Sequence, residues 1–540
     1  MSYLHLTPVR AAFWVKLPPF GSIILIATYL GFILGLEFAN NDYPGAQHYQ
    51  ALGLRAGWLA VSQIPLIVLL AGKNNLIGLL TGVGYERLNV YHRWVSRGLL
   101  ILATMHFGFQ STGWNKYGLM SLEWDTDTCP PTGIAAYSIL LFINFVNLVP
   151  TRNLSYDFFV AQHIVTFFGF IVAIMIHLPP TALYTRVYIW ISIGLYLFDR
   201  TVRTVRYSIN NISPGNATLI ALDDTATKIQ VSNKRIHKWS PGAHILLSIP
   251  RFGVLQSHPA TILSTPSSHN GDLVFILRAH RGFTRRILKG ATASMTLPKT
   301  NLDTAMQQGH IAFVDGPYYS SHSDFAYFDT VVLIAGGTGV TFTLSALLNL
   351  AERASSQKFP VRRIDFTWLI KKVDHISWIA KELQIAHEQL KSAGIEINIR
   401  GFVTGATGVA RVSHSMKQEQ QQDEGKEGCS YQKNGLLPDR IEPHEEKDIN
   451  LDGPVPKTMV PASASIQLPS AEFILGRPDL MHLLNKSIVY AEGETAIGAC
   501  GPLGLVTAVR TAVVKISDDR AVHKGTGAQG IYLHVESLYS

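Results

Sequence analysis

The sequence predicts a polytopic α-helical membrane domain of about six spans, an antiparallel β-barrel, and an α/β domain with a parallel sheet. Three observations support this fold class. Long apolar segments fill roughly the first 200 residues. Short alternating stretches broken by Gly, Pro and Asn follow, and from about residue 330 strands alternate with helices. We therefore expect domains at 1–205, 206–322 and 323–540.

Composition agrees with a membrane part joined to a soluble part. The chain has 540 residues, which is too long for one domain, and it is 47% hydrophobic yet 16% charged. The net charge is +8, but the basic residues lie beside apolar spans or are dispersed. A membrane surface is therefore the expected partner, and nucleic acid is not. The three cysteines form no CxxC pair and no zinc or iron–sulfur spacing, which leaves metal chemistry to histidine.

Six apolar segments are long enough to cross a bilayer. The predicted spans are 21–39, 56–72, 91–110, 131–149, 158–178 and 183–199. The first is interpreted as a helix and not a signal peptide, because it is long and no small-residue cleavage site is evident. The segment 74–84 is apolar but short and rich in glycine, so we expect a re-entrant or interfacial piece.

Two of these spans carry histidines at one repeated spacing. His92 and His106 are 14 residues apart, and so are His163 and His177. Fourteen residues are almost four helical turns, so both imidazoles project from nearly the same face, roughly 21 Å apart. A lone histidine in an apolar helix is more often a packing or pore residue. The repetition favours two facing pairs, each of which ligates one haem iron from both sides.

Charges in the connecting segments predict the orientation. One set of segments is basic and carries Lys73, Arg87, Arg152, Arg200, Arg203 and Arg206. The loop 111–130 is acidic and carries Glu123, Asp125 and Asp127 against Lys116. Basic segments mark the cytosolic side, so both termini are expected in the cytosol. His92 and His163 then lie near the inner leaflet, and His106 and His177 near the outer one.

The soluble part divides into two strand patterns. Barrel strands are expected at 218–222, 228–231, 244–249 and 273–278. Parallel strands are expected at 330–335, 365–370, 395–403, 473–475, 495–499 and 531–535, with helices at 341–353 and 376–392 on both faces. Between about 412 and 468 the composition is dominated by Gln, Glu, Lys, Ser and Pro, which predicts a disordered insertion.

Two glycine turns follow apolar strands and precede helices. They contain Gly336, Gly337, Thr338, Gly339 and Val340 in one, and Cys500, Gly501 and Pro502 in the other. Glycines let the backbone approach a pyrophosphate, and the helix N-terminus offers unpaired N–H groups. Two such turns at the carboxyl ends of parallel strands define a ligand crevice. Cys500 has no histidine partner nearby in sequence, so we interpret it as lining this crevice and not as a nucleophile.

Two further motifs lie in the barrel region. They are 258–262, with His258, Pro259, Thr261 and Ile262, and 281–286, with Gly282, Phe283 and Thr284. Both are candidate flavin and phosphate contacts. By physical argument alone they are weak, because Pro and Gly also make ordinary turns and Arg285 and Arg286 also fit a solvated basic face.

The histidine set and the order of these motifs resemble the ferric reductase and NADPH oxidase superfamily, especially fungal ferric reductase transmembrane components. The resemblance covers nearly the whole chain. It implies a ferredoxin-reductase-like module, with FAD at 206–322 bound by the two barrel motifs, and NADPH bound by the two glycine turns and 475–479. Lys371, Lys372 and Arg477 are candidates for the 2′-phosphate, against the alternative that the lysines are simply solvated. Asp315-Gly-Pro-Tyr318 resembles the element that links the two soluble domains.

The resemblance also implies an activity. Cytosolic NADPH would reduce FAD, and electrons would pass through two haem b groups to an extracytoplasmic ferric or cupric chelate, with no catalytic protein residue. An iron permease/oxidase system is an expected partner. The plasma membrane is the expected location, with the vacuolar membrane as the alternative. The equal histidine spacings favour reductases over the alternative, a superoxide-producing NADPH oxidase.

Two positions depart from the family pattern. Ala260 stands where an aromatic is usual, and Phe342 where proline is usual. The C-terminus, with Tyr539, also differs from the usual aromatic end. These departures leave a second alternative open, a diverged haem-binding membrane protein without enzymatic activity.

Overall fold

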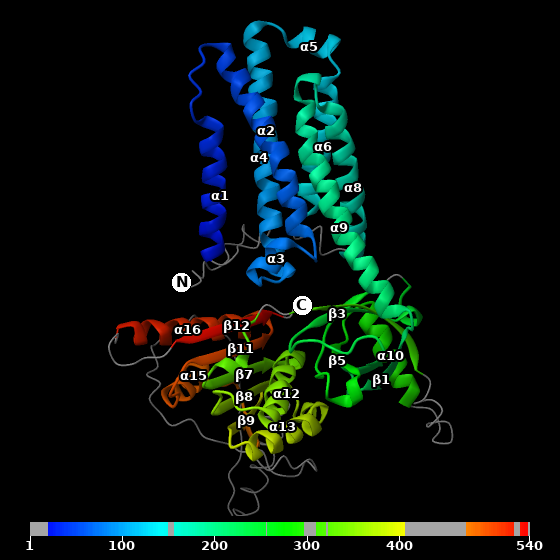
Figure 1. Ribbon diagram of the computed structural model, residues 1–540, viewed down its shortest axis with the longest axis vertical. Coiled ribbons are helices and arrows are strands. Elements are labelled where there is room, and N and C mark those ends of the chain that lie inside the picture. The colour runs from blue at the N-terminus through cyan, green and yellow to red at the C-terminus, as the bar shows by residue number, and fades with distance from the viewer. Residues whose placement is uncertain are drawn as a thin grey trace, which may run out of the picture. The chain divides into compact units, whose positions relative to one another are not determined.

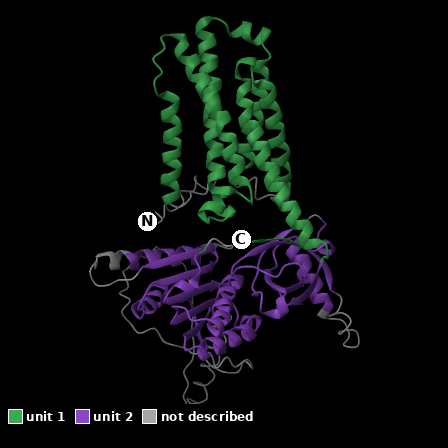
Figure 2. Cartoon of the chain, viewed as in Figure 1, with its two compact units in different colours: residues 1–214, 314–322 green, residues 215–313, 323–540 purple. Residues whose placement is uncertain are grey.

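The structure, a computed structural model, describes residues 20–148, 156–254, 256–295, 309–319, 322–405, 471–522 and 530–537. The chain forms two compact units (Figure 2). One comprises residues 1–214 and 314–322, and the other comprises residues 215–313 and 323–540. The insertion predicted at 412–468 and Tyr539 lie outside the described residues.

The first unit is a bundle of long helices (Figure 1). Its long helices are α1 (Phe20–Phe38), α2 (Ala46–Ala71), α4 (Tyr85–Tyr117), α6 (Cys129–Val146), α8 (Tyr156–His177) and α9 (Arg186–Asn211). Shorter pieces are α3 (Leu76–Thr81), α5 (Met120–Thr126) and η2 (Pro180–Thr185). Buried apolar side chains such as Ile64, Leu102 and Ile189 form its core.

Five helical segments in the described residues are long and apolar enough to cross a membrane: α1, α2, α6, α8, and η2 with α9. The sixth long helix, α4, has 33 residues and lies beside α2 (Figure 1). Its ends carry Glu86, Arg87, Arg93 and Lys116, so its mean apolar character is lower. The described residues thus form long helices at all six predicted places, and five of these are apolar enough to span a membrane. Outward-facing side chains such as Val165 suit a lipid environment.

The segment 74–84 forms the short helix α3. It begins at Asn75, whose side chain accepts a hydrogen bond from the Gly78 N–H at 2.5 Å. It ends at Gly82, which has a φ of 68°. Leu79 and Leu80 are 79% and 84% exposed, which agrees with an interfacial piece.

A strap joins α9 to the segment 314–318. The Asn211 amide donates to the Val314 carbonyl and accepts from the Val314 N–H, both at 2.9 Å. Asn210 donates to the Gly316 carbonyl at 2.5 Å, and the Arg203 Nε donates to the Asp315 carboxylate at 2.7 Å. The chain therefore returns to the end of α9 after about 100 residues in between.

The described residues form two six-stranded sheets in the second unit, and the last strand of the first sheet continues into residues 314–318 of the first unit. The strands of the first, the barrel, are β1 (Gly215–Ala221), β2 (Ala226–Ser232), β3 (His244–Ser248), β4 (His258–Thr261), β5 (Leu273–Arg278) and β6 (His310–Tyr318). Their order is β4-β3-β6-β1-β2-β5, with antiparallel pairs such as Thr218 opposite Gln230. Alternate side chains, including Ile229, Ile245 and Leu247, fill the interior. The helix α10 (Phe283–Met295) follows β5.

The second sheet is parallel, with order β10-β9-β8-β7-β11-β12. Its strands are β7 (Thr330–Gly336), β8 (Arg363–Ile370), β9 (Glu396–Val403), β10 (Ala471–Leu475), β11 (Thr495–Gly501) and β12 (Ile531–Ser537). Along β7, Val331 and Leu333 pack with α12 (Val340–Ser356) and α13 (Ala380–Ser392). Val332 and Ile334 pack with α15 (Leu480–Val489) and α16 (Leu503–Val522), so helices cover both faces, as predicted (Figure 1).

One predicted helix begins later than expected. The helix expected at 376–392 is divided into a 3-10 turn, η8 (Val373–Trp378), and α13 from Ala380. The His375 ring stacks on Trp378 at 4.2 Å, and its Nε2 lies 3.1 Å from the Asp223 carboxylate in the barrel. These tertiary contacts stabilise a separate turn before α13, and the periodicity of the local sequence gives no sign of them.

Candidate functional site

The four spaced histidines lie in two pairs between α4 and α8. The ring centroids of His92 and His163 are 6.3 Å apart, and those of His106 and His177 are 6.0 Å apart. Two metal–imidazole bonds of roughly 2 Å each, with the ring nitrogens' distance from their ring centres, span roughly 6 Å. Each pair therefore fits one metal ion between its two rings, which is the geometry of a bis-histidine haem.

Hydrogen bonds to the backbone orient three of the four rings. In each of them, Nδ1 lies within hydrogen-bonding distance of a backbone carbonyl oxygen. The pairs are His92 with Ile67 (2.9 Å), His106 with Gly53 (2.6 Å) and His177 with Cys129 (3.0 Å). A carbonyl oxygen only accepts, so Nδ1 carries the proton in each ring and Nε2 keeps the free lone pair. The His163 Nδ1 is buried, and no described residue hydrogen-bonds to it.

The two glycine turns lie directly against each other at the carboxyl ends of β7 and β11. These strands are paired, with Ala335 opposite Cys500. A Cβ atom added at Gly339 would lie 2.7 Å from the Cys500 carbonyl carbon, and one added at Gly501 would lie 3.1 Å from the Gly336 Cα. Only glycine allows this close backbone approach. The turn leads into α12, whose N-terminus offers an anion site.

Cys500 and Phe342 belong to the packed interior beside these turns. Cys500 is 4% exposed, and burial raises the pKa of its thiol well above the usual range. A thiol of this kind stays protonated and is a poor nucleophile. Phe342 is fully buried and stacks on His534 at 5.5 Å. The residue that replaces the usual proline is therefore a core side chain.

The candidate phosphate-binding cations follow β8 and β10, which both pair with β9. Lys371 follows β8 and Arg477 follows β10, and both are exposed. Lys372 is engaged elsewhere, because its Nζ lies 3.2 Å from the Asp224 carboxylate in the barrel. Gly476 has a φ of 109°, which lets the chain turn after β10 before Asp479 caps α15. Lys371 and Arg477 are thus the cations at this edge that remain available for a 2′-phosphate.

The two barrel motifs meet at one place. The His258 ring of β4 stacks on Phe283, with centroids 6.4 Å apart and planes at 19°. Burial lowers the pKa of His258, so its ring is neutral at physiological pH. Gly282 has a φ of 76° and precedes α10, and the Thr284 hydroxyl accepts from the His280 N–H at 2.9 Å. The turn thereby presents a helix N-terminus beside His258.

Not all residues of these motifs direct their side chains outward. Ile262 is fully buried and Ala260 is 1% exposed, so both side chains belong to the barrel interior. Pro259 is exposed and Thr261 is half-buried. A flavin would therefore touch this motif through His258, Pro259, Thr261 and the backbone, and an aromatic at position 260 would need space inside the barrel.

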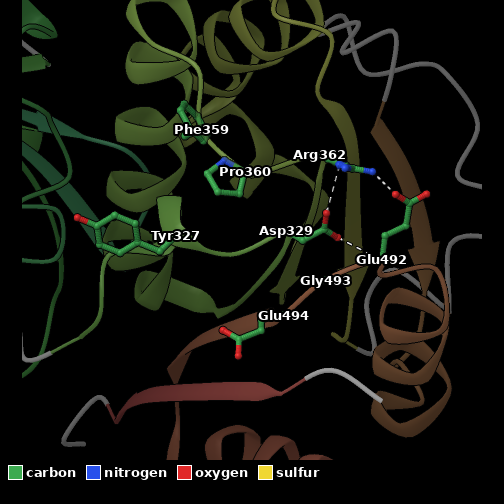
Figure 3. A pocket seen from close by; sticks show the side chains of 8 residues that line it. All are labelled: Tyr327, Asp329, Phe359, Pro360, Arg362, Glu492, Gly493 and Glu494. Atoms are coloured by element: carbon green, nitrogen blue, oxygen red, sulfur yellow. Dashed lines mark hydrogen bonds and ion pairs between the residues drawn. The ribbon is translucent and has the colours of Figure 1, made fainter. Parts of the chain in front are cut away.

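A surface pocket in the second unit lies away from the glycine turns. Figure 3 shows it lined by Tyr327, Asp329, Phe359, Pro360, Arg362, Glu492, Gly493 and Glu494. These residues precede β7, β8 and β11, so the pocket lies at the amino ends of the strands. Three of its charges pair, since Arg362 bridges Asp329 and Glu492. The nucleotide crevice, by contrast, lies at the carboxyl ends.

Sequence reasoning missed a charged contact between the barrel and the nucleotide-binding sheet. Glu382 of α13 is 4% exposed, and its carboxylate lies 2.6 Å from the Lys228 Nζ and 3.1 Å from the His269 Nε2. Burial alone would raise the pKa of Glu382, but the hydrogen bond from His269 and the charge of Lys228 lower it to about 2. No local sequence pattern predicts this contact, because its partners are far apart in sequence.

A second missed cluster surrounds the predicted linking element in the first unit. The Tyr318 ring lies between the Lys73 Nζ (5.1 Å) and the Arg206 guanidinium (4.4 Å), and its hydroxyl donates to Asp315 at 2.7 Å. Burial, followed by repulsion from Arg203, lowers the pKa of Lys73 to about 8. The element 315–318 is thus held by cations from α9 and from the segment after α2.

Known protein families match the three parts of the chain separately, namely the helical bundle, the barrel and the nucleotide-binding sheet. A profile described as "Ferric reductase like transmembrane component" matches residues 56–174, "FAD-binding domain" matches 211–322, and "Ferric reductase NAD binding domain" matches 328–514. The three parts of this chain are thus similar, in order, to the membrane, FAD-binding and NAD-binding domains of ferric reductases. The matched ranges include His92, His106 and His163, both barrel motifs and both glycine turns, and His177 lies just beyond the first range.

Curated relatives are fungal ferric reductases. The "Probable cell surface ferric reductase kap2" of Aspergillus oryzae is 28% identical over 69% of this chain and 51% of its own length. The "Ferric/cupric reductase transmembrane component 1" of Candida albicans is 26% identical over 85% of this chain and 54% of its own length. The chain thus spans about half the length of the curated relatives it matches.

Among solved structures, a ferredoxin NADP+ reductase from Neisseria gonorrhoeae with bound FAD and NADP is 12% identical, with a TM-score of 0.32. The match covers 60% of this chain and 97% of that one. The chain is an integral membrane protein that carries FAD-binding and NAD-binding domains.

Proposed function

We propose that this ferric reductase carries electrons from cytosolic NADPH, through FAD and two bis-histidine haems, to an extracytoplasmic ferric or cupric chelate. The observation that carries the proposal is the two histidine pairs, each spaced for one iron. When bound, FAD accepts two electrons as a hydride and the haems relay them singly.

The ligands are assigned by pair. His92 and His163 hold the inner haem, and His106 and His177 hold the outer one. Each oriented ring keeps Nε2 for iron, because its Nδ1 proton is committed to a carbonyl. With both His106 and His177 on its iron, the outer haem would have no open ligand position, so the chelate would be reduced beside it without binding that iron. The acidic residues Glu123, Asp125 and Asp127 lie in the connection between α4 and α6, although an ordinary solvated loop has the same composition.

The soluble residues bind and orient the cofactors. His258 and Phe283 form a flat wall beside the flavin, and the turn at Gly282 receives its phosphate at the start of α10. The nicotinamide cofactor lies over residues 336–340 and 500–502, where paired glycines admit its pyrophosphate. Lys371 and Arg477 select NADPH by meeting the 2′-phosphate.

The proposed orientation rests on the charges of the connecting segments, and the proposed location rests on the name of a relative. Basic segments on the side of Arg200, Arg203 and Arg206 support a cytosolic flavin barrel and nucleotide-binding sheet. The name "cell surface ferric reductase" of one relative supports the plasma membrane over the vacuolar membrane. An iron permease/oxidase system is the proposed partner downstream of the reduced metal.

The test is NADPH-dependent reduction of a ferric chelate by membranes that contain the protein, without oxygen. We expect reduction by wild type, loss in His106→Ala and His177→Ala, and retention in His48→Ala, a histidine outside both pairs. No anaerobic reduction but superoxide in air would favour the oxidase alternative. Haem absorbance without bound flavin and without reduction by NADPH would favour the non-enzymatic alternative.

A further inference from the structure

The outer histidine pair lies in two matching cradles that the inner pair lacks. On α2, the His106 Nδ1 contacts the Gly53 carbonyl, and its ring lies over Gly57, four residues later. On α6, the His177 Nδ1 contacts the Cys129 carbonyl, and its ring lies over Gly133, again four residues later. Two different helices thus present the same carbonyl–glycine arrangement to the two rings.

The spacing of four has a physical reason. In an α-helix the carbonyl of residue i already accepts the N–H of residue i+4, so a second donor must approach across residue i+4. A Cβ at position 57 would lie 2.9 Å from the His106 Nδ1, and one at position 133 would lie 2.7 Å from the His177 Cε1. Real Cβ atoms do not approach ring atoms so closely. At positions 57 and 133, glycine therefore leaves the space in which each ring lies when its Nδ1 reaches the carbonyl.

The inner pair is held differently. The His92 Nδ1 contacts the Ile67 carbonyl, and the residue four positions later is Ala71. The His163 Nδ1 is buried without a hydrogen-bond partner among the described residues. The outer pair thus has two carbonyl-bound rings over glycine, whereas the inner pair has one carbonyl-bound ring and no glycine cradle.

We propose that Gly57 and Gly133 are positioning residues that tune the outer haem site, an inference that rests on the proposed haem ligation. Each glycine allows a carbonyl to hold the Nδ1 proton, which orients the ring and makes Nε2 a stronger electron donor. Stronger donation from two axial ligands favours ferric over ferrous iron. The two glycines therefore lower the potential of the outer site below the value it would have without these hydrogen bonds, which suits it to reduce a metal chelate outside the membrane.

The test compares Gly57→Ala and Gly133→Ala with Gly108→Ala and Gly169→Ala in the full-length protein. The control glycines lie on α4 and α8, and an added Cβ meets nothing within 4 Å at Gly108 and only the Ile139 Cδ1, at 4.0 Å, at Gly169. Haem content per chain and the two midpoint potentials are measured by optical redox titration. The His106→Ala variant identifies which potential belongs to the outer site.

We expect each cradle variant to raise the outer potential alone, by a tenfold change in equilibrium, about 59 mV for one electron, or to lose the outer haem alone. Unchanged potentials and haem content, or loss of both haems together, would overturn the proposal. Wild-type protein with fewer than two haems would instead contradict the proposed function.

Discussion

Replacing Glu382 with glutamine removes the negative charge that joins α13 to the flavin barrel. The Glu382 side chain is 5% exposed and faces Lys228 and His269, so little solvent screens the interaction. Its pKa falls from 4.5 to about 2 on folding. At 1.36 kcal/mol per pKa unit, this shift corresponds to about 3 kcal/mol of stability.

The sign follows from linkage. A carboxylate with a lowered folded-state pKa stabilises the fold fully above its unfolded pKa, and the contribution disappears as pH falls from about 4.5 to about 2. Glu382→Gln should therefore lower the free energy of unfolding by about 3 kcal/mol at neutral pH. The variant should also lose little further stability between pH 4.5 and 2, because it lacks the titrating carboxylate. The Lys228→Met change should cost much less when Glu382 is already glutamine, because the two groups share one interaction.

The measurement is urea unfolding of the full-length protein in detergent, followed by tryptophan fluorescence. Trp368 and Trp378 report locally, since their rings lie 6.2 Å apart next to α13. Glu388→Gln is the control, because Glu388 is exposed on the same helix and should change stability by less than about 0.5 kcal/mol. Equal midpoints for the two variants, or an unchanged acid dependence in Glu382→Gln, would refute the reasoning.

Three further outcomes follow from the nucleotide crevice. Gly339→Ala places a Cβ against the Cys500 backbone and should weaken NADPH binding by at least about tenfold in calorimetry, whereas Gly504→Ala, with nothing within 4 Å, should not. Lys371→Ala should raise the Kd for NADPH but not for NADH, while Lys372→Ala, held by Asp224, should change neither; equal effects would assign the 2′-phosphate elsewhere. Because burial raises its thiol pKa, Cys500 should resist iodoacetamide at pH 7.5 until the protein unfolds, and peptide mass spectrometry that finds it modified in the folded protein would contradict this.

Features with a local cause were predictable from the sequence. The strand at 273–278 has the bounds that its apolar run predicted, and the long apolar helices follow from length and composition. The two glycine turns were predicted to share a crevice, because each follows a strand whose carboxyl end lies at the same sheet edge, and the structure brings them into backbone contact.

Features that depend on distant partners were not. Glu382 reads as a surface residue of an amphipathic helix until Lys228, 154 residues earlier, is placed against it. Phe342 reads as a defect in a motif, but His534 from the last described strand packs on it. Gly57 and Gly133 look like ordinary glycines of membrane helices, and only the pairing of helices shows which imidazoles lie over them.

The strap between α9 and residues 314–316 has a consequence for how this chain tolerates change. Asn210 and Asn211 hold Gly316 and Val314, so the chain between them leaves and re-enters the helical unit at one anchored point. The entropic cost of closing a loop grows only slowly with its length, so the length of the chain between these two anchor points should change the stability of the helical bundle little. The flavin barrel should therefore be exchangeable. A relative's barrel that replaces the residues between 213 and 313 would keep every hydrogen bond of the anchor.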